Sequence, residues 1–268
     1  MHIRIEDDFD LDKIINSGQC FRPCKISEGI CRFVTKDSVL YMSSAADKNE
    51  YEVSCSEDEW EKIWKDYFDL DTDYECIRSS VPKSDEYMTQ CALAGKGIRI
   101  LKQDPWEMLI SFIISQRKSI PAIRTCIEKL CVRYGTQVKT ERENLNLFPT
   151  PKQLAAATKA ELMQCGLGYR VDYIMDATDR VCNNMIDLEK IKELDDESLY
   201  NELIKIKGVG KKVANCILLF AYHRTGRAPV DVWISRVIDE KYNGNDPFIS
   251  YGEYAGIMQQ YAFYNSIR

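Results

Sequence analysis

The alternation of apolar and polar positions divides the chain into two regions of different character. In the first eighty or so residues, the short β-prone runs ICRFV, VLYM and YEVSC are separated by polar residues, which is typical of strands in an antiparallel sheet. Ser56 and Glu59 then have the spacing of a capping box. The apolar residues behind them recur at helical spacing: Trp60, Ile63, Trp64, Tyr67 and Phe68. This region predicts a small sheet with an amphipathic helix packed on it.

The rest of the chain predicts one helix after another. Pro105 and Pro121 stand where helices start, and Gly135 stands where the second of these helices ends. Proline is favoured in the first helical turn and glycine at the end of a helix. Thr158 and Glu161 form another capping-box pair. We therefore expect an α+β fold with a small N-terminal antiparallel β-sheet domain and a larger all-α domain.

The composition supports two folded domains, which we expect at residues 1–82 and 83–268. A chain of 268 residues with 45% hydrophobic residues can bury a core in each. The 36 Lys and Arg against 42 Asp and Glu give a net charge of -6. This charge disfavours non-specific nucleic-acid binding except where basic residues gather locally. Basic residues gather in the segment from Leu203 to Val230, which has no acidic residue. It contains Lys205, Lys207, Lys211, Lys212, Arg224 and Arg227. A second basic cluster consists of Arg117, Lys118 and Arg124.

The eleven cysteines and two histidines do not predict a metal site. No two cysteines have C-x-x-C spacing, and His2 and His223 are too isolated for zinc. We expect buried, reduced thiols in a cytosolic protein. The run MHIRIEDDFDLD has no apolar signal-peptide segment, and no stretch approaches eighteen apolar residues. We therefore expect neither secretion nor membrane insertion.

The stretch KGVGKKVANC, residues 207–216, predicts a turn that opens a buried helix. Gly208 and Gly210 flank Val209, and the helical run SLYNELIKI precedes them, so we expect a helix-hairpin-helix at about residues 196–222. The free N–H groups and the positive end of the second helix can hold a DNA phosphate without reading a base. A P-loop is excluded, because it needs G-x-x-x-x-G-K-[ST] after a strand. Alone, the hairpin predicts only non-specific DNA binding, and a purely structural turn is the alternative.

The run PVDVWISRV places one carboxylate, Asp231, in an apolar context downstream of the hairpin lysine Lys212. This combination resembles the helix-hairpin-helix-GPD superfamily of DNA base-excision glycosylases. Six segments are similar, in the same order, to those of eukaryotic-type 8-oxoguanine DNA glycosylases: SGQCFR (17–22), LKQDPWEMLISFIIS (101–115), GLGYR (166–170), GVGKKVANC (208–216), PVDVW (229–233) and YAGIMQQYAF (254–263). Related branches carry four clustered cysteines after the hairpin, whereas Cys216 is the last cysteine here, so we expect no iron–sulfur cluster.

The resemblance implies a bifunctional DNA glycosylase/AP lyase that flips 8-oxoguanine out of duplex DNA. A neutral lysine amine would attack C1′, form a Schiff base and permit β-elimination. Burial, the helix N-terminus and neighbouring cations all favour a neutral amine at Lys212. Charge does not distinguish Lys211 from Lys212. The family pattern assigns the nucleophile to Lys212 and leaves Lys211 as a phosphate contact or a solvated lysine. Asp231 would stabilise the developing sugar cation.

The resemblance also implies a pocket for the extruded base. Guanine has an acceptor at N7 and 8-oxoguanine an N–H donor, and the family reads this difference with a glycine carbonyl that matches Gly18. Gln259 matches the residue that reads the Watson–Crick edge, and two further residues match those that sandwich the base. The predicted substrate-binding set is Gly18, Gln19, Phe21, Cys216, Gln259 and Phe263. Without the resemblance, Phe263 and Cys216 would be interpreted as core residues.

The predicted DNA contacts combine the hairpin with residues that match the family's stack-filling wedge and its readers of the opposite base. Tyr169 matches the wedge, and Arg170 matches a group that meets the orphaned cytosine. Three positions depart from the family: Arg117 stands for an asparagine, Ala122 for a second cytosine-reading arginine, and Trp233 for a histidine. We therefore expect relaxed selectivity for the opposite base. The DNA-binding set is Arg117, Tyr169, Arg170, Gly208, Val209, Gly210, Lys211 and Trp233.

The expected partner is duplex DNA containing 8-oxoguanine, bound by a monomer without a membrane or an obligate protein partner. Such a protein would be cytoplasmic, or located in the nucleoid or nucleus with the DNA. We expect no cofactor beyond a structural cation at the hairpin, where the carbonyls of Ile204, Ile206 and Val209 match positions that hold one in relatives. Two alternatives stay open: a glycosylase for another damaged base, such as an alkylated purine or oxidised pyrimidine, and a non-catalytic helix-hairpin-helix DNA-binding protein.

Overall fold

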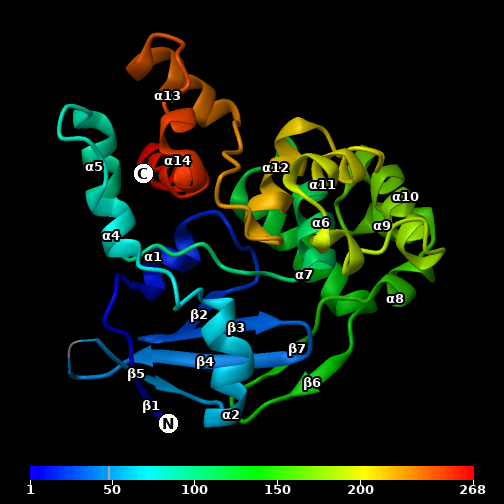
Figure 1. The fold of residues 1–268 in the computed structure, drawn as a ribbon. Coiled ribbons are helices and arrows are strands. Elements are labelled where there is room, and N and C mark those ends of the chain that lie inside the picture. Colours follow the sequence, from blue (N-terminus) through cyan, green and yellow to red (C-terminus); the bar gives the residue numbers. More distant parts are fainter. Residues whose placement is uncertain (48) are drawn as a thin grey trace. The chain divides into compact units, whose positions relative to one another are not determined.

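The structure, a computed structural model, describes residues 1–47 and 49–268. It contains two compact units, neither of which is one continuous stretch of chain. Unit 1 comprises Met1–Phe33, Val39–Lys102 and His223–Arg268, and unit 2 comprises Val34–Ser38 and Gln103–Tyr222. The segment after Tyr222 therefore belongs to the same unit as the N-terminus. The predicted division at residues 82 and 83 stays a prediction. Figure 1 labels the elements.

Unit 1 contains the predicted antiparallel sheet, apart from Val34–Ser38, which belong to unit 2. Its five strands have the order β1-β5-β4-β3-β2. Their bounds are β1 His2–Arg4, β2 Cys24–Ser27, β3 Ile30–Thr35, β4 Ser38–Ser44 and β5 Glu50–Val53. The three predicted runs correspond to β3, β4 and β5. The two edge strands were not predicted, because HIR and CKIS are short and largely polar.

The predicted amphipathic helix packs on this sheet, but it is not a regular α-helix (Figure 1). Its parts are α2 Glu57–Glu59, the π-helical turn η1 Trp60–Trp64 and α3 Lys65–Tyr67. Ser56 caps it by accepting from the Glu59 N–H at 3.2 Å. The second half of the predicted capping box is wrong, because the Glu59 carboxylate accepts from the Trp64 indole N–H at 2.9 Å instead. Phe68 then packs edge-on against Phe33 of β3, with ring centroids 4.9 Å apart.

The other helices of unit 1 come from both ends of the chain. They are α1 Leu11–Asn16, α4 Tyr74–Ser79, α5 Glu86–Ala94, α13 Val232–Tyr242, the 3-10 helix η4 Phe248–Tyr254 and α14 Ala255–Ser266. Helix α14 packs against α5 and α13 (Figure 1), and residues 255–262 are all buried. A side chain on α14 therefore lies inside unit 1 unless it belongs to the last turn.

A buried ion-pair cluster, centred on Asp69, joins distant segments of unit 1. Asp69 is 2% exposed. Its carboxylate lies 3.0 Å from His223 Nε2 and 3.1 Å from Lys102 Nζ, and it accepts from the Tyr74 hydroxyl at 2.9 Å. Burial raises the pKa of Asp69, but the hydrogen bonds and charges of His223 and Lys102 outweigh burial and lower it to about 2.

Replacing Asp69 by asparagine should lower the free energy of unfolding by about 2–4 kcal/mol at pH 7, since it removes a buried carboxylate that pairs with Lys102 and accepts hydrogen bonds from Tyr74 and His223. The pKa of Asp69 is lower in the folded protein than its ordinary value of 3.8. The carboxylate therefore stabilises the fold above that value, and this stabilisation is lost as pH falls toward 2. Urea unfolding at several pH values measures both effects.

Asp66 provides a matched control for this prediction. It also pairs with Lys102, at 2.8 Å, but its side chain is 71% exposed. An exposed pair contributes at most about 1 kcal/mol, so Asp66→Asn should leave the unfolding free energy nearly unchanged. Equal losses in the two variants would show that the Asp69 cluster has no special role in stability.

Unit 2 is helical apart from one short two-stranded ribbon. Its helices are α6 Pro105–Ser115, α7 Ile120–Tyr134, α8 Pro151–Ala155, α9 Lys159–Gln164, η2 Gly168–Arg170, α10 Val171–Cys182, η3 Lys190–Glu193, α11 Asp196–Leu203 and α12 Lys211–Phe220. The ribbon pairs β6 Gln137–Lys139 with β7 Asn144–Asn146. It was not predicted, and it departs from the all-α expectation only locally.

The helix boundaries of unit 2 follow the predicted signals closely. Pro105 begins α6, and Asp104 caps it by accepting from the Glu107 N–H at 2.8 Å. Helix α7 starts one residue before Pro121. Thr158 and Glu161 form both bonds of the predicted capping box. Nowhere in residues 1–47 and 49–268 does a helix combine the length and apolar character needed to span a bilayer.

Candidate functional site

The predicted helix-hairpin-helix is present in unit 2 as α11, a connecting loop and α12. The loop runs from Ile204 to Gly210. It is longer than the predicted turn of Gly208, Val209 and Gly210, because α11 already ends at Leu203. Gly208 has a φ of +84°, and a Cβ at this position would overlap the ring of Tyr173. This glycine is required both by its left-handed backbone and by close packing.

The first turn of α12 is open for an anion. Gly210 is its N-cap and offers no side-chain cap, and a Cβ on Gly210 would meet nothing within 4 Å. Among the described residues, the N–H groups of Gly210, Lys211 and Lys212 have no backbone acceptor. Free N–H groups at a helix N-terminus form an anion-binding site. The geometry fits a phosphate, as the glycine pattern predicts.

Two side chains fix the hairpin loop, and neither was predicted. Gln116, the C-cap of α6, donates from Nε2 to the carbonyls of Ile113 and Gly208, both at 3.1 Å. Asp176 accepts from the backbone N–H of Lys207 at 2.9 Å. The sequence gives no local signal for these bonds, because each joins residues that lie far apart along the chain.

The two hairpin lysines differ in burial, a difference that charge alone could not predict. Lys211 is exposed, whereas Lys212 is half-buried and its Nζ lies 5.3 Å from the ring centroid of Phe112. Phe112 stacks on Phe220 with centroids 5.5 Å apart. Neither lysine forms an ion pair with a described carboxylate. Cys216 follows Lys212 by one helical turn, is 3% exposed, and so shares a face of α12 with it.

Asp231 lies in unit 1 as the N-cap of α13. Its Oδ1 accepts from the Ile234 N–H at 2.9 Å, and the residue is half-exposed. Within the described part of the chain, Oδ2 accepts no hydrogen bond. An N-cap contributes about 1 kcal/mol to stability, so this aspartate has a structural use that is separate from catalysis. One oxygen stays available for a ligand.

The residues of unit 1 that are predicted to read the base lie on α14 and in the SGQ segment. Gly18 has a φ of +81°, a conformation that favours glycine. Gln259 is 4% exposed, and its Oε1 has no hydrogen-bond partner among the described residues. Phe263 follows by one turn on the same face and is half-buried. A buried acceptor without a partner costs free energy, and a ligand would satisfy it.

Gln19 and Phe21 lie deeper than a direct base contact requires. Gln19 is fully buried, and its amide bonds to Ser17, Arg99 and Leu101 at 2.8 to 2.9 Å. Phe21 is 6% exposed. The structure therefore places both as supports of the segment that carries Gly18, and their predicted contact with the base stays a prediction.

The predicted DNA contacts of unit 2 differ in accessibility. Tyr169 is 51% exposed and packs edge-on against Tyr173, as a wedge would require. Arg170 is 5% exposed, stacks on the Tyr169 ring at 4.5 Å and donates to the carbonyls of Leu167 and Gln116. It points toward the protein, so its predicted contact with the opposite base would require it to release these carbonyls.

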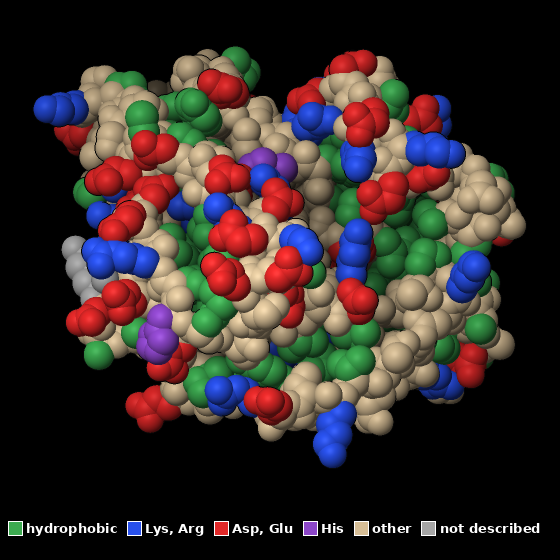
Figure 2. Space-filling view, turned by 60° about the horizontal axis from the view of Figure 1, so that its bottom comes forward, with side chains coloured by type: hydrophobic (Ala, Val, Ile, Leu, Met, Phe, Trp, Pro, Cys, Tyr) green, Lys and Arg blue, Asp and Glu red, His purple; other side chains and the backbone are tan. Residues whose placement is uncertain are grey.

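Two further predicted DNA contacts are exposed. Arg117 has a φ of +53°, which is unusual for a residue with a side chain. Trp233 on α13 is 46% exposed, and the Arg236 guanidinium lies 5.5 Å from its ring centroid. On the face shown in Figure 2, Lys and Arg side chains are interspersed with Asp and Glu. This face therefore offers no broad basic surface, and a DNA contact on it would depend on local basic groups.

The predicted cation site at the hairpin is only partly free. The Ile206 carbonyl accepts from the Val209 N–H at 3.0 Å, and Ile204 is the C-cap of α11. Elsewhere in the described residues, no three His, Cys, Asp or Glu side chains gather in a metal-binding arrangement. The cation stays a prediction.

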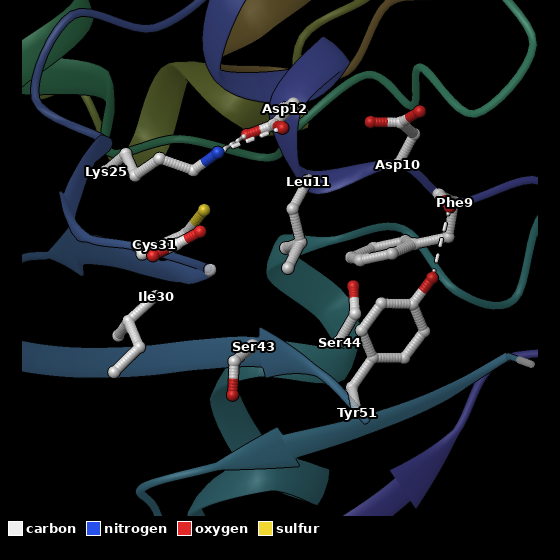
Figure 3. A pocket seen from close by; sticks show the side chains of 12 residues that line it. Phe9, Asp10, Leu11, Asp12, Lys25, Ile30, Cys31, Ser43, Ser44 and Tyr51 are labelled. Carbon is white, nitrogen blue, oxygen red and sulfur yellow. Dashed lines mark hydrogen bonds and ion pairs between the residues drawn. The ribbon is translucent and has the colours of Figure 1, made fainter. Parts of the chain in front are cut away.

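A cavity of about 460 Å³ opens beside the sheet of unit 1 (Figure 3). Its lining includes Asp10, Asp12 and Glu28, with Lys25 already paired to Asp12 at 2.9 Å. None of the predicted site residues lines it. Because carboxylates outnumber its single lysine, this cavity is unsuited to DNA and is not the base pocket.

Residues 2–109 match the family model described as "8-oxoguanine DNA glycosylase, N-terminal domain", and residues 110–247 match "HhH-GPD superfamily base excision DNA repair protein". The "N-glycosylase/DNA lyase" of Saccharomyces cerevisiae is 36% identical over 162 residues, which is 56% of this chain and 43% of the yeast protein. The match thus spans less than half of that relative's length.

Two further relatives are matched over most of their length. The "Probable N-glycosylase/DNA lyase" of Methanothermobacter thermautotrophicus is 30% identical over 230 residues, 75% of this chain and 73% of that protein. The solved Clostridium acetobutylicum 8-oxoguanine glycosylase/lyase, in complex with double-stranded DNA containing cytosine opposite 8-oxoG, is 31% identical with a TM-score of 0.90, covering 100% of this chain and 97% of that one.

Proposed function

The chain belongs to the HhH-GPD superfamily of base excision DNA repair proteins, and from this premise we propose that it is a bifunctional DNA glycosylase/AP lyase acting on 8-oxoguanine in duplex DNA. The observation that carries the proposal is the position of Lys212. It stands in the open first turn of α12, half-buried and without an acidic partner among the described residues. An amine placed there can serve as a nucleophile beside a bound DNA backbone.

In the proposed reaction, the hairpin supplies the phosphate-binding groups and the nucleophile. The Lys212 amine attacks C1′ of the extruded nucleotide, and the bond from C1′ to the base breaks with both electrons going to the base, which takes up a proton. Opening of the sugar gives a Schiff base at Lys212. Loss of a C2′ proton then expels the 3′ phosphate by β-elimination.

Other residues are proposed to recognise the base and to stabilise the transition state. The Gly18 carbonyl accepts from the N7–H that only 8-oxoguanine carries, and Gln259 binds the Watson–Crick edge. The Asp231 carboxylate stabilises the positive charge that develops on the sugar. A non-catalytic DNA-binding module would have no use for Lys212 and Asp231, and a glycosylase for alkylated purines or oxidised pyrimidines would have no use for the Gly18 carbonyl.

A single-turnover substrate panel tests the proposed function. We expect the protein to release 8-oxoguanine opposite cytosine and to leave undamaged duplex, alkylated purine and oxidised pyrimidine intact under the same conditions. Preferred release of another lesion would replace the substrate, and binding without any release would favour the non-catalytic alternative.

The same panel should show a weak preference for the opposite base. Ala122 near the start of α7 offers no hydrogen-bond donor, and Arg170 is held by backbone carbonyls. A good bidentate contact is worth about 1–3 kcal/mol of discrimination, so losing one should narrow the preference for cytosine to roughly tenfold or less. Ala122→Arg should sharpen it. A cytosine preference of several hundredfold in the unaltered protein would contradict this expectation.

A further inference from the structure

Gln260 is a polar side chain in an otherwise tightly packed helix. It is 2% exposed in the buried part of α14, and its Nε2 donates to the Ser17 carbonyl at 2.6 Å. Burying an amide is unfavourable unless it forms hydrogen bonds. An apolar residue of the same size would fill the space without this cost, so the bond to Ser17 is the feature that distinguishes glutamine at this position.

The residue on the other side of Gly18 is fixed as well. Gln19 Nε2 donates to Ser17 Oγ and to the Arg99 carbonyl, both at 2.9 Å, and its Oε1 accepts from the Leu101 N–H at 2.8 Å. Ser17 Oγ in turn donates to the Ile14 carbonyl at 2.7 Å. The Ser17 backbone is therefore held immediately before Gly18, and the Gln19 side chain is anchored immediately after it.

Between these two anchors, Gly18 presents a free acceptor. Its carbonyl accepts no hydrogen bond from any described residue, and its φ of +81° places it in a region that glycine enters easily. Glycine is also the residue with the most backbone freedom, and fixing one residue costs about 1–2 kcal/mol. The bond from Gln260 fixes the peptide between Ser17 and Gly18, and the side-chain bonds of Gln19 anchor the residue that follows Gly18, before any ligand binds.

Resting on the function proposed above, we propose that Gln260 is a positioning residue for lesion recognition, which orients the Gly18 carbonyl toward the N7–H of the extruded base. It acts through the Ser17 carbonyl and touches neither the base nor the reacting atoms. Its neighbour Gln259 carries the unpartnered Oε1. Adjacent residues of α14 thus divide two tasks, one reading the base and the other fixing the backbone that reads it.

Gln260→Met tests this role, because methionine has a similar unbranched shape and no donor. We expect the protein concentration that half-saturates single-turnover release of 8-oxoguanine to rise roughly five- to thirty-fold, from the ordering cost of one residue. The maximal rate should change less than this concentration. The affinity for undamaged duplex, measured by competition, should stay within about twofold, since that duplex offers no N7–H.

Met258→Leu is the matched control. Met258 is fully buried in the same helix, and no hydrogen bond joins it to Ser17 among the described residues. This swap nearly conserves volume. Met258→Leu should leave the protein concentration that half-saturates release of 8-oxoguanine unchanged, even if the melting temperature falls. If Gln260→Met does not fold, Gln19→Met tests the same idea from the opposite anchor and should weaken lesion binding selectively.

The outcomes separate this inference from the proposed function. If the unaltered protein releases 8-oxoguanine but Gln260→Met half-saturates at the same concentration, only the positioning role is wrong. Equal weakening toward damaged and undamaged duplex would also overturn it, because that pattern indicates a general structural role. If the unaltered protein releases no 8-oxoguanine, the proposed function itself fails.

Discussion

Replacing Lys212 by glutamine should abolish both release of 8-oxoguanine and covalent trapping by borohydride, while binding of lesion-containing duplex persists. The substitution removes the amine that attacks C1′ but keeps a polar side chain of similar length on α12. Gly18 and Gln259, which are proposed to read the base, lie in unit 1 and are unchanged. Gel-shift affinity and single-turnover release, measured on the same preparation, distinguish loss of chemistry from loss of binding.

Lys211→Gln is the control, because Lys211 is the adjacent residue and is exposed. It should retain base release and trapping and lose at most the contribution of one phosphate contact, seen as a slightly shallower salt dependence of binding. If Lys211→Gln abolishes trapping and Lys212→Gln does not, the assignment of the nucleophile is wrong by one residue.

Asp231→Asn should lower the single-turnover rate of base release by about two to four orders of magnitude, the range seen when a positioned charge-stabilising group is lost. Asparagine is as good an N-cap as aspartate, so the bond to the Ile234 N–H and the start of α13 should be preserved. The substitution therefore removes the charge and spares the fold. A melting temperature near that of the unaltered protein would verify this separation.

Asp195→Asn is the matched control, because Asp195 is a helix N-cap for which no catalytic role is proposed. It caps α11 by accepting from the N–H groups of Glu197 and Ser198, and Asp195→Asn should leave the rate of release unchanged. A normal rate for Asp231→Asn would show that this aspartate serves only as a helix cap.

Much of the fold could be predicted from local patterns. The strands β3, β4 and β5 follow from β-prone runs, and the starts of α6 and α9 follow from proline and from a capping box. Helix α14 could not be bounded from periodicity, since its apolar and polar residues are spread around the helix and nearly all are buried. The π-helical turn at Trp60–Trp64 was also missed, because the spacing of its aromatic residues fits an α-helix as well.

Some features of the candidate site could likewise be predicted from local patterns, and others could not. The hairpin glycines and Lys212 carry strong local signals, and the structure places them in an open helix N-terminus. The bonds of Gln116 to Gly208 and of Gln260 to Ser17 join residues 92 and 243 positions apart. No local pattern encodes such long-range pairs. The inward direction of Arg170 is likewise a consequence of tertiary packing, and the GLGYR motif alone suggested an outward contact.

The central claim is that a lysine of the hairpin forms a Schiff base with the sugar of an 8-oxoguanine nucleotide. Borohydride trapping of the unaltered protein with a duplex carrying 8-oxoguanine opposite cytosine tests it most directly, followed by mass mapping of the labelled peptide. We expect a covalent adduct at Lys212 with the 8-oxoguanine duplex and no adduct with the undamaged duplex. Release of the base without any adduct, or an adduct at another lysine, would contradict it.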